Sequence, residues 1–150
     1  MKKNGFTLIE LLAVIVVIGL IMLIAVPNIV GISTGVRKDQ MLTDAKKMIS
    51  LAKYKVETDY DIRTLSKEDI CDGSQCILTI NMLNVNGDVG TDPDSGENYF
   101  SESKVIYSKN NDVANYCVTL VGRDRTIGVP NCVNEEDLHS RSNVQDRVEE

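Results

Sequence analysis

The sequence is poor in the residues from which active sites and large cores are built. Its 150 residues include no tryptophan, two phenylalanines, three prolines and one histidine, His139, which stands among polar residues near the C-terminus. The chain has no glycine-rich phosphate loop, no nucleophile elbow and no cluster of histidines and carboxylates. We therefore expect no catalysis and no cofactor, and a core built from aliphatic side chains with help from tyrosine.

Positive charge is also scarce. The chain carries 16 lysines and arginines against 22 aspartates and glutamates, a formal net charge of −6. Proteins that bind nucleic acids do so mainly by neutralising phosphates with lysine and arginine, so general nucleic-acid binding is not expected. A chain of this length has room for one helical anchor and one small domain.

What the sequence does contain is a long apolar run near its start. Lys2 and Lys3 precede the run, and the residues from Phe6 to Val26 carry a single charge, that of Glu10. A helix of this length spans about 31 Å, enough to cross the hydrocarbon core of a bilayer. Because basic residues stay on the cytoplasmic side, we expect a single-pass span of the cytoplasmic membrane, with the N-terminus inside and the head outside.

Glu10 is the unexpected residue in this run. An ionised carboxylate at membrane depth is costly unless it is compensated, so its presence points to a function. An ordinary secretory signal would have a shorter apolar core, with a small-residue cleavage site after it. A passive single-pass anchor is the alternative interpretation, but such an anchor gains nothing from a buried carboxylate.

The start of the chain resembles a known processing segment. Lys-Lys-Asn-Gly, then Phe-Thr-Leu-Ile-Glu, then an apolar helix, is similar to the cleavage and methylation segment of type IV prepilins and pseudopilins. The resemblance implies that a prepilin peptidase cuts between Gly5 and Phe6 and N-methylates the Phe6 amine, leaving Glu10 in the mature chain. We hypothesise that Glu10 then pairs with the Phe6 ammonium of a neighbouring copy and sets the register of subunit docking.

The helix is expected to continue beyond the apolar run. Pro27 removes one backbone hydrogen bond and should bend the helix, and pilins, which this segment resembles, have a proline at the matching position. Between Leu42 and Val56, apolar residues recur every three or four positions, the pattern of one helical face. The sequence thus predicts one helix from about Phe6 to Glu57, with two helices broken at Gly31–Gly35 as the alternative.

The four cysteines all follow the predicted span, on the side where disulfides persist. Four cysteines allow three pairings. Cys71–Cys76 with Cys117–Cys132 is favoured because each of these pairs brackets a turn. A structural zinc site is the rival interpretation, although the cysteine spacings differ from the tight pairs of most zinc modules.

Alternating apolar residues predict a small sheet in the second half. The signal is clearest in Asn115–Val121, and Ile77–Ile80, Val105–Tyr107 and Thr126–Val129 are further predicted strands. We expect a three- or four-stranded antiparallel meander that packs on the Leu42–Val56 helix face, an α+β fold. This layout is similar to that of pilins, in which a cysteine pair near the C-terminus likewise closes an exposed region of the head.

One acidic loop is a weak candidate for a calcium site. Asp92, Asp94 and Glu97 have a suggestive spacing, but the glycine and the distal glutamate of a calcium loop are out of register. Major pseudopilins, which the start of the chain resembles, carry a calcium site in the head domain. A plain acidic loop is the favoured interpretation, so no metal is predicted.

These observations predict five segments: a leader (1–5), a transmembrane assembly helix (6–27), its amphipathic continuation (28–57), a globular head (58–132) and a polar tail expected to be mobile (133–150). The proposed assembly residues are Phe6, Glu10 and Pro27.

The predicted function is that of a structural subunit of a type IV pilus-like filament, stored in the membrane and polymerised through its N-terminal helix into an extracellular or envelope-spanning fibre. The resemblance implies as partners other copies of the chain, related minor pilins, the prepilin peptidase, an assembly platform protein and an extension ATPase. A type II secretion pseudopilin is one alternative. A membrane-anchored extracellular binding module that never polymerises is the other.

Overall fold

The computed structural model describes residues 7–148, with the exception of the side chains of residues 23–32. The chain divides into two compact units, Met1–Val36 and Arg37–Glu150. A single helix, α1 (Leu8–Thr58), makes up the described part of the first unit apart from Thr7, and it also supplies the first element of the second unit. The bounds of α1 lie within two residues of those predicted from the sequence.

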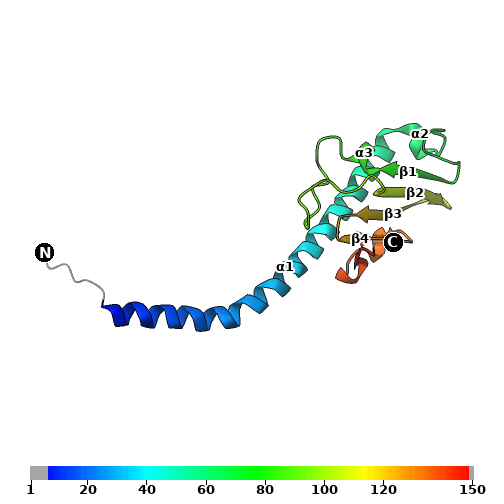
Figure 1. The fold of residues 1–150 in the computed structure, drawn as a ribbon. Helices are drawn as coiled ribbons and strands as arrows, with labels where there is room; N and C mark the ends of the chain where they lie inside the picture. Colours follow the sequence, from blue (N-terminus) through cyan, green and yellow to red (C-terminus); the bar gives the residue numbers. More distant parts are fainter. Residues whose placement is uncertain (1–6, 149–150) are drawn as a thin grey trace. The chain divides into compact units, whose positions relative to one another are not determined.

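The second unit, which we call the head, is built on an antiparallel sheet (Figure 1). The strand order is β1-β2-β3-β4-β6, and β5 also pairs with β3. The strands are β1 (Gln75–Thr79), β2 (Lys104–Asn110), β3 (Val113–Val121), β4 (Arg125–Ile127), β5 (Val133–Asn134) and β6 (Val144–Asp146). Two short helices, α2 (Tyr60–Arg63) and α3 (Ile80–Leu83), flank β1 in the sequence, and two 3₁₀ turns, η1 (Glu135–Asp137) and η2 (Arg141–Asn143), lie between β5 and β6.

The core of the head lies between α1 and one face of this sheet. The helix contributes a buried stripe with the predicted spacing: Met41, Leu42, Ala45, Met48, Ile49, Ala52 and Val56. The sheet contributes buried alternate residues of its strands: Leu78, Val105, Tyr107, Tyr116, Val118, Leu120 and Ile127. The apolar residues that recur every 3.6 positions in the helix therefore pack against those that recur every second position in the strands. The α+β, pilin-like fold class is confirmed.

The sheet is larger than predicted because the C-terminal segment joins it. The expectation that residues 133–150 lack the apolar residues to pack is wrong for the part that the structure describes. Leu138 is fully buried and Val144 is 2% exposed. β6 extends the sheet at β4 through a ladder in which Thr126 lies opposite Gln145. A strand of three residues is too short to show in the sequence pattern, and its pairing partner is distant in the chain.

Ion pairs fasten the same segment to α1. The Arg141 guanidinium donates two hydrogen bonds of 2.6 Å to the Asp39 carboxylate, a bidentate arrangement. This contact lowers the pKa of Asp39 below its usual value. The Lys53 ammonium lies 2.5 Å from the Glu135 carboxylate. Glu135 and Arg141, which the sequence placed in a solvated tail, therefore form ion pairs with the helix.

Candidate assembly and processing site

The described part of the first unit is an apolar helix without a polar face. Between Leu8 and Met22, twelve large apolar side chains are exposed, with exposed fractions from 46% at Ile18 to 83% at Leu8. A helix that is apolar on all sides is stable only when another apolar phase surrounds it, either lipid or other helices. Within the described residues of this unit, nothing folds back to cover these side chains.

Glu10 caps the N-terminus of this helix. The backbone N–H and the hydroxyl of Thr7 each donate a hydrogen bond of 2.9 Å to Oε2 of Glu10. Thr7 precedes the first residue of α1 and Glu10 is the third residue of the helix, so the bond from the Thr7 N–H is one half of a capping box. The Glu10 N–H bonds to the carbonyl oxygen of Thr7 and not to its hydroxyl. A carboxylate has two oxygens, and both donors here share one of them. The Glu10 carboxylate can thus hold its own helix end and still receive a further donor on Oε1.

The remaining predicted processing residues fall outside the described structure. Gly5 and Phe6, the predicted cleavage and methylation positions, precede its first described residue. Pro27 lies within α1, but its side chain is among those not described. In the part of the chain that is described, no helix has both the length and the apolar character of a membrane span. The predicted span 6–27 falls only partly within that part.

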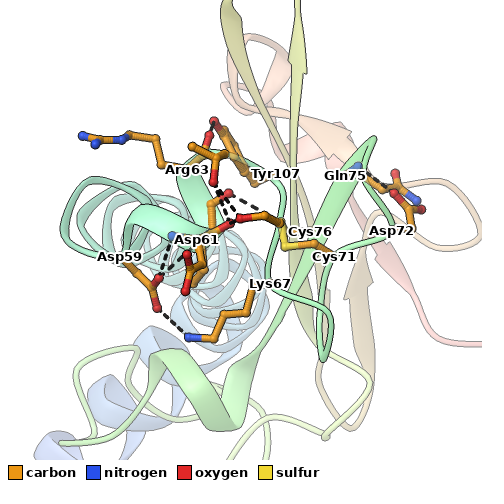
Figure 2. The surroundings of a disulfide bond; sticks show 12 residues. Asp59, Asp61, Arg63, Lys67, Cys71, Asp72, Gln75, Cys76 and Tyr107 are labelled. Carbon is orange, nitrogen blue, oxygen red and sulfur yellow. Dashed lines mark hydrogen bonds and ion pairs between the residues drawn. A yellow bond between two sulfur atoms is a disulfide. The ribbon is translucent and has the colours of Figure 1, made fainter.

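In the head, the loop that follows α1 is held to the end of the helix by charge and capping (Figure 2). The Asp59 carboxylate caps α2 by accepting hydrogen bonds from the backbone N–H groups of Asp61 and Ile62. It also contacts the Lys67 ammonium at 2.5 Å, which lowers the pKa of Asp59. At the other side of this loop, the Tyr107 hydroxyl donates to the carbonyl of Arg63 over 3.3 Å, joining β2 to α2.

The first disulfide closes the same loop against the sheet. Cys71 is bonded to Cys76, whose side chain is fully buried at the start of β1. Between them, Asp72 makes the turn: its Oδ1 accepts from the backbone N–H groups of Ser74 and Gln75 at 2.8 Å. A hydrogen bond from the Ser74 hydroxyl, together with these two backbone bonds, lowers the pKa of Asp72 to about 2. The pair brackets a turn, as the sequence indicated.

The second disulfide joins Cys117 of β3 to Cys132. Gly128 makes this connection possible, because its φ of +70° suits glycine and a Cβ there would lie 2.5 Å from the carbonyl oxygen of Val118. Both cysteine pairs are those favoured from the sequence, and the rival zinc interpretation loses its ligands to these bonds.

The candidate calcium residues do not converge. Asp92 is 1% exposed, and its carboxylate accepts hydrogen bonds from the Ser95 hydroxyl and the backbone N–H groups of Asp94 and Arg123. Glu97 is exposed. Among the residues that the structure describes, no three histidines, cysteines or carboxylates are grouped to hold a metal. Asp92 therefore organises its own loop, and Gly122 lets it approach, since a Cβ there would lie 2.9 Å from Oδ1 of Asp92.

Asp94 forms ion pairs with two arginines. Its Oδ1 forms an ion pair with Arg125 of β4 and a longer one, of 3.4 Å, with Arg37 of α1. The side chains of Asp94 and Arg125 are only 1% and 12% exposed. Within the described residues, Oδ2 of Asp94 and Nε of Arg125 are buried without a hydrogen-bond partner. This contact fastens the acidic loop to both the helix and the sheet.

A third buried carboxylate, Asp44, lies on the buried face of α1. The Tyr99 hydroxyl donates a hydrogen bond of 2.8 Å to its Oδ2, and the Lys47 ammonium lies 3.8 Å from its Oδ1. Burial nevertheless raises the pKa of Asp44 above its usual value. Sequence reasoning missed Asp44 because it assigned this residue, with the lysines of the helix, to positions away from the apolar face.

The comparisons with known proteins bear on the N-terminus alone. Residues 1–26 match the family model described as the prokaryotic N-terminal methylation motif. No curated protein and no solved structure matched the chain. The matched residues include the Gly5–Phe6 junction, Thr7 and Glu10, and they include most of the exposed apolar helix. The chain thus carries the N-terminal signature of type IV prepilins and pseudopilins.

Proposed function

We propose that the chain is a structural subunit of a type IV pilus-like filament, cut by a prepilin peptidase between Gly5 and Phe6 and polymerised through its N-terminal helix. The observation that carries the proposal is the methylation motif at residues 1–26, within which the described large apolar side chains of α1, from Leu8 to Met22, are exposed. The motif implies the peptidase and an N-terminal membrane anchor. The exposed helix supplies the surface for assembly.

The energetics of the helix favour assembly once it leaves the lipid. Covering one valine, leucine or isoleucine side chain stabilises an assembly by about 1.5–3 kcal/mol relative to exposure in water. Association itself costs about 4–15 kcal/mol. Between Leu8 and Met22 twelve large apolar side chains are available, so burial of all of them, at about 18–36 kcal/mol, exceeds the cost of association. In the membrane, the same side chains are covered by lipid, which keeps the stored subunit soluble in the bilayer.

Glu10 would fix the axial register between neighbouring helices, which an otherwise uniform apolar surface leaves undefined. Packing among identical apolar helices leaves their axial register weakly defined, whereas a carboxylate in an apolar bundle demands a partner at one height. The Phe6 ammonium created by cleavage is the donor that we assign to Glu10 of a neighbouring copy. The Thr7 hydrogen bonds to Oε2 hold the carboxylate in place for that contact.

The further partners follow from the same proposal. A polytopic platform protein and an extension ATPase would drive extraction from the membrane, and related minor pilins would share the N-terminal helix surface. The head would face outward and carry whatever contact the filament makes, in adhesion, motility, DNA uptake or secretion.

Mechanical shearing of cells that produce the chain tests the proposal. Filament subunits are released with the sheared material, and immunoblotting should find the chain there, while an integral membrane protein blotted in parallel stays with the cells. Because pseudopilins share the motif, a chain that stays with the cells should be cross-linked in its membrane. A ladder of multimers would indicate a pseudopilin. Monomers alone would overturn the proposal in favour of an anchored binding module.

A further inference from the structure

The turn after α3 carries an asparagine that is followed by a glycine. Asn86 and Gly87 lie in the loop that leads from α3 to β2 (Figure 1). Asparagine is a chemically labile residue, because the backbone nitrogen of the next residue can attack its side-chain amide carbon. A glycine in the next position favours this attack, since it places no side chain beside the attacking nitrogen. The sequence of this turn therefore makes Asn86 a candidate for modification.

The structure leaves the Asn86 side chain accessible and unbound. Asn86 and Gly87 are both exposed, and among the residues that the structure describes no hydrogen bond holds the Asn86 side chain. Gly87 has a φ of +77°, and a Cβ built on it would meet nothing within 4 Å. The Asn86 amide can therefore turn towards the Gly87 nitrogen without displacing another group.

The attacking nitrogen is also weakly held. The Gly87 N–H donates to the carbonyl oxygen of Asn84 over 3.4 Å. Backbone hydrogen bonds usually measure about 2.7–3.2 Å, and longer ones are weaker. Because little is lost when this bond breaks, the backbone around Gly87 can adjust to bring its nitrogen to the Asn86 amide carbon.

Both ends of this turn are fixed to the head. Val89 is fully buried, and its N–H donates a hydrogen bond of 2.9 Å to the side-chain oxygen of Asn84. The N–H of Asn84 bonds in turn to the carbonyl oxygen of Ile80 over 2.7 Å. The tip of the turn, residues 85–88, is exposed throughout. A change at Asn86 can therefore occur while the head stays folded.

Asp72 shows how the structure can block the same chemistry. It too precedes a glycine, Gly73, but its Oδ1 accepts hydrogen bonds from the Ser74 hydroxyl and from the N–H groups of Ser74 and Gln75 (Figure 2). These bonds lower the pKa of Asp72 to about 2, so its carboxylate stays ionised and resists attack by a nitrogen.

Asn111, in the turn between β2 and β3, lacks the other requirement. It is exposed, as Asn86 is, and it has a positive φ. The next residue is Asp112, whose side chain stands beside the backbone nitrogen and hinders its approach. Among the residues that the structure describes, Asn86 alone combines an unbound, accessible amide with a following glycine.

We propose that Asn86 is a site of spontaneous deamidation. The Gly87 nitrogen forms a bond to Cγ of Asn86, the Cγ–Nδ2 bond breaks, and the proton of the Gly87 N–H leaves with the amide group as ammonia. A water molecule then opens the cyclic imide at either of its carbonyl groups. The product at this position is an aspartyl residue or an isoaspartyl residue, in which the main chain runs through the former side-chain carbons. Water is the only co-reactant.

The modification changes the surface of the head and leaves its core intact. Each converted copy gains one negative charge, two residues from Asp88, in a chain whose formal net charge is already −6. Hydrolysis of the imide does not restore the amide, so the converted fraction rises with the age of the molecule. In a filament, older subunits would therefore be more acidic than new ones, and this consequence alone rests on the proposed function.

Peptide mapping of the full-length chain by mass spectrometry tests the site. The chain is incubated in detergent at neutral pH, and the peptide containing Asn86 is followed for the mass change from amide to acid and for its two isomeric products. We expect Asn86 to convert at least about tenfold faster than Asn111 in the same samples. Asp72 should give no isoaspartyl product. Conversion of Asn86 at or below the rate of Asn111 overturns the proposal.

Two variants test the role of the turn. Gly87→Asn keeps a residue that tolerates positive φ but adds a side chain beside the attacking nitrogen, so it should slow conversion of Asn86 about tenfold. Asn86→Asp carries the charge of the product and should unfold at the same urea concentration as the parent, because the tip is exposed. An unchanged rate in Gly87→Asn, or a lower urea midpoint in Asn86→Asp, contradicts the assignment.

The deamidation proposal and the filament proposal fail in different ways, because the mapping needs no filaments. A chain that is sheared off as filaments but keeps Asn86 intact on incubation contradicts only the modification site. A chain that converts at Asn86 but forms no multimer in the sheared or the membrane fraction contradicts only the filament function.

Discussion

The two units of this chain solve the problem of apolar surface in opposite ways. The described residues of the first unit expose nearly every large side chain, and under the proposed function lipid or other copies cover them. The head buries its apolar residues against one another and then adds two disulfides and several ion pairs between distant segments. Under the proposed function, the first unit exchanges lipid for other helices, and the head keeps its structure during this transfer.

The contrast extends to how each unit uses carboxylates. Among the described residues of the first unit, Glu10 is the one acidic residue, and its partner Thr7 is three residues away. In the head, Asp39 and Asp94 contact residues far along the chain, at Arg141 and Arg125. The partner of Glu10 is local, as the proposed assembly contact requires, whereas distant partners hold the segments of the head together.

The largest expected effect is on filament assembly and comes from removing the carboxylate of Glu10. Glu10→Ala should leave cleavage at Gly5 intact but lower incorporation into filaments by about tenfold or more, because the Phe6 ammonium of a neighbour then lacks its partner in an apolar bundle. Immunoblots of sheared and cell-bound fractions measure it. The matched variant Thr7→Val removes only the hydroxyl donor to Glu10 and should cost less. Normal incorporation of Glu10→Ala would contradict the proposed pairing of Glu10 with Phe6 of a neighbouring copy.

The next largest effect concerns the buried ion pair of the head. Arg125→Met should lower the free energy of unfolding by about 3–5 kcal/mol, since Asp94 would keep a buried charge with only the longer contact to Arg37. Urea denaturation of the full chain in detergent measures it. Lys109→Met, which breaks an exposed pair, is the control and should change stability little. Equal effects of the two substitutions would show that the Asp94 contact is not as dry as its burial indicates.

The two disulfides should differ in their contributions to stability. Loss of the Cys117–Cys132 bond, which spans 15 residues, should cost about 3 kcal/mol, whereas loss of Cys71–Cys76, which spans five, should cost about 2 kcal/mol. Paired serine variants, compared by urea denaturation, give both values. A larger cost for the shorter loop would mean that local packing around Cys76, and not chain entropy, dominates.

The smallest expected effect is on the pH dependence of the head. Because burial raises the pKa of Asp44 above its ordinary value of 3.8, this carboxyl stabilises the fold fully below that value and less as the pH rises through the raised pKa. Asp44→Asn keeps an acceptor for the Tyr99 hydroxyl and should therefore remove that loss, so that the variant gains stability relative to the parent between acid and neutral pH. Denaturation curves across this range test it, and a variant that loses stability on the same rise contradicts it.

Much of the fold was predictable because its signals are local. The bounds of α1 followed from an apolar run joined to a stripe with helical spacing, and β3 followed from alternation in Asn115–Val121. Both cysteine pairs bracket turns, and that was enough to favour their pairing. In each case, the determining pattern lies within a short stretch of sequence.

The rest depends on contacts that no local pattern shows. Leu138 and Val144 stand singly among polar residues, and they are buried because β6 pairs with β4. The spacing of Asp92 and Asp94 shows two carboxylates but not their directions: one faces its own loop and the other two arginines. At the candidate site, the sequence drew attention to Glu10, whereas the hydrogen bonds from Thr7 to its carboxylate required the structure.

The mass of the mature chain, measured by intact-protein mass spectrometry on sheared filaments, tests the central claim most directly. The account predicts a chain that begins at an N-methylated Phe6, lacks the five-residue leader and contains two disulfides. A chain that still begins at Met1, in filaments or in the membrane, would contradict it.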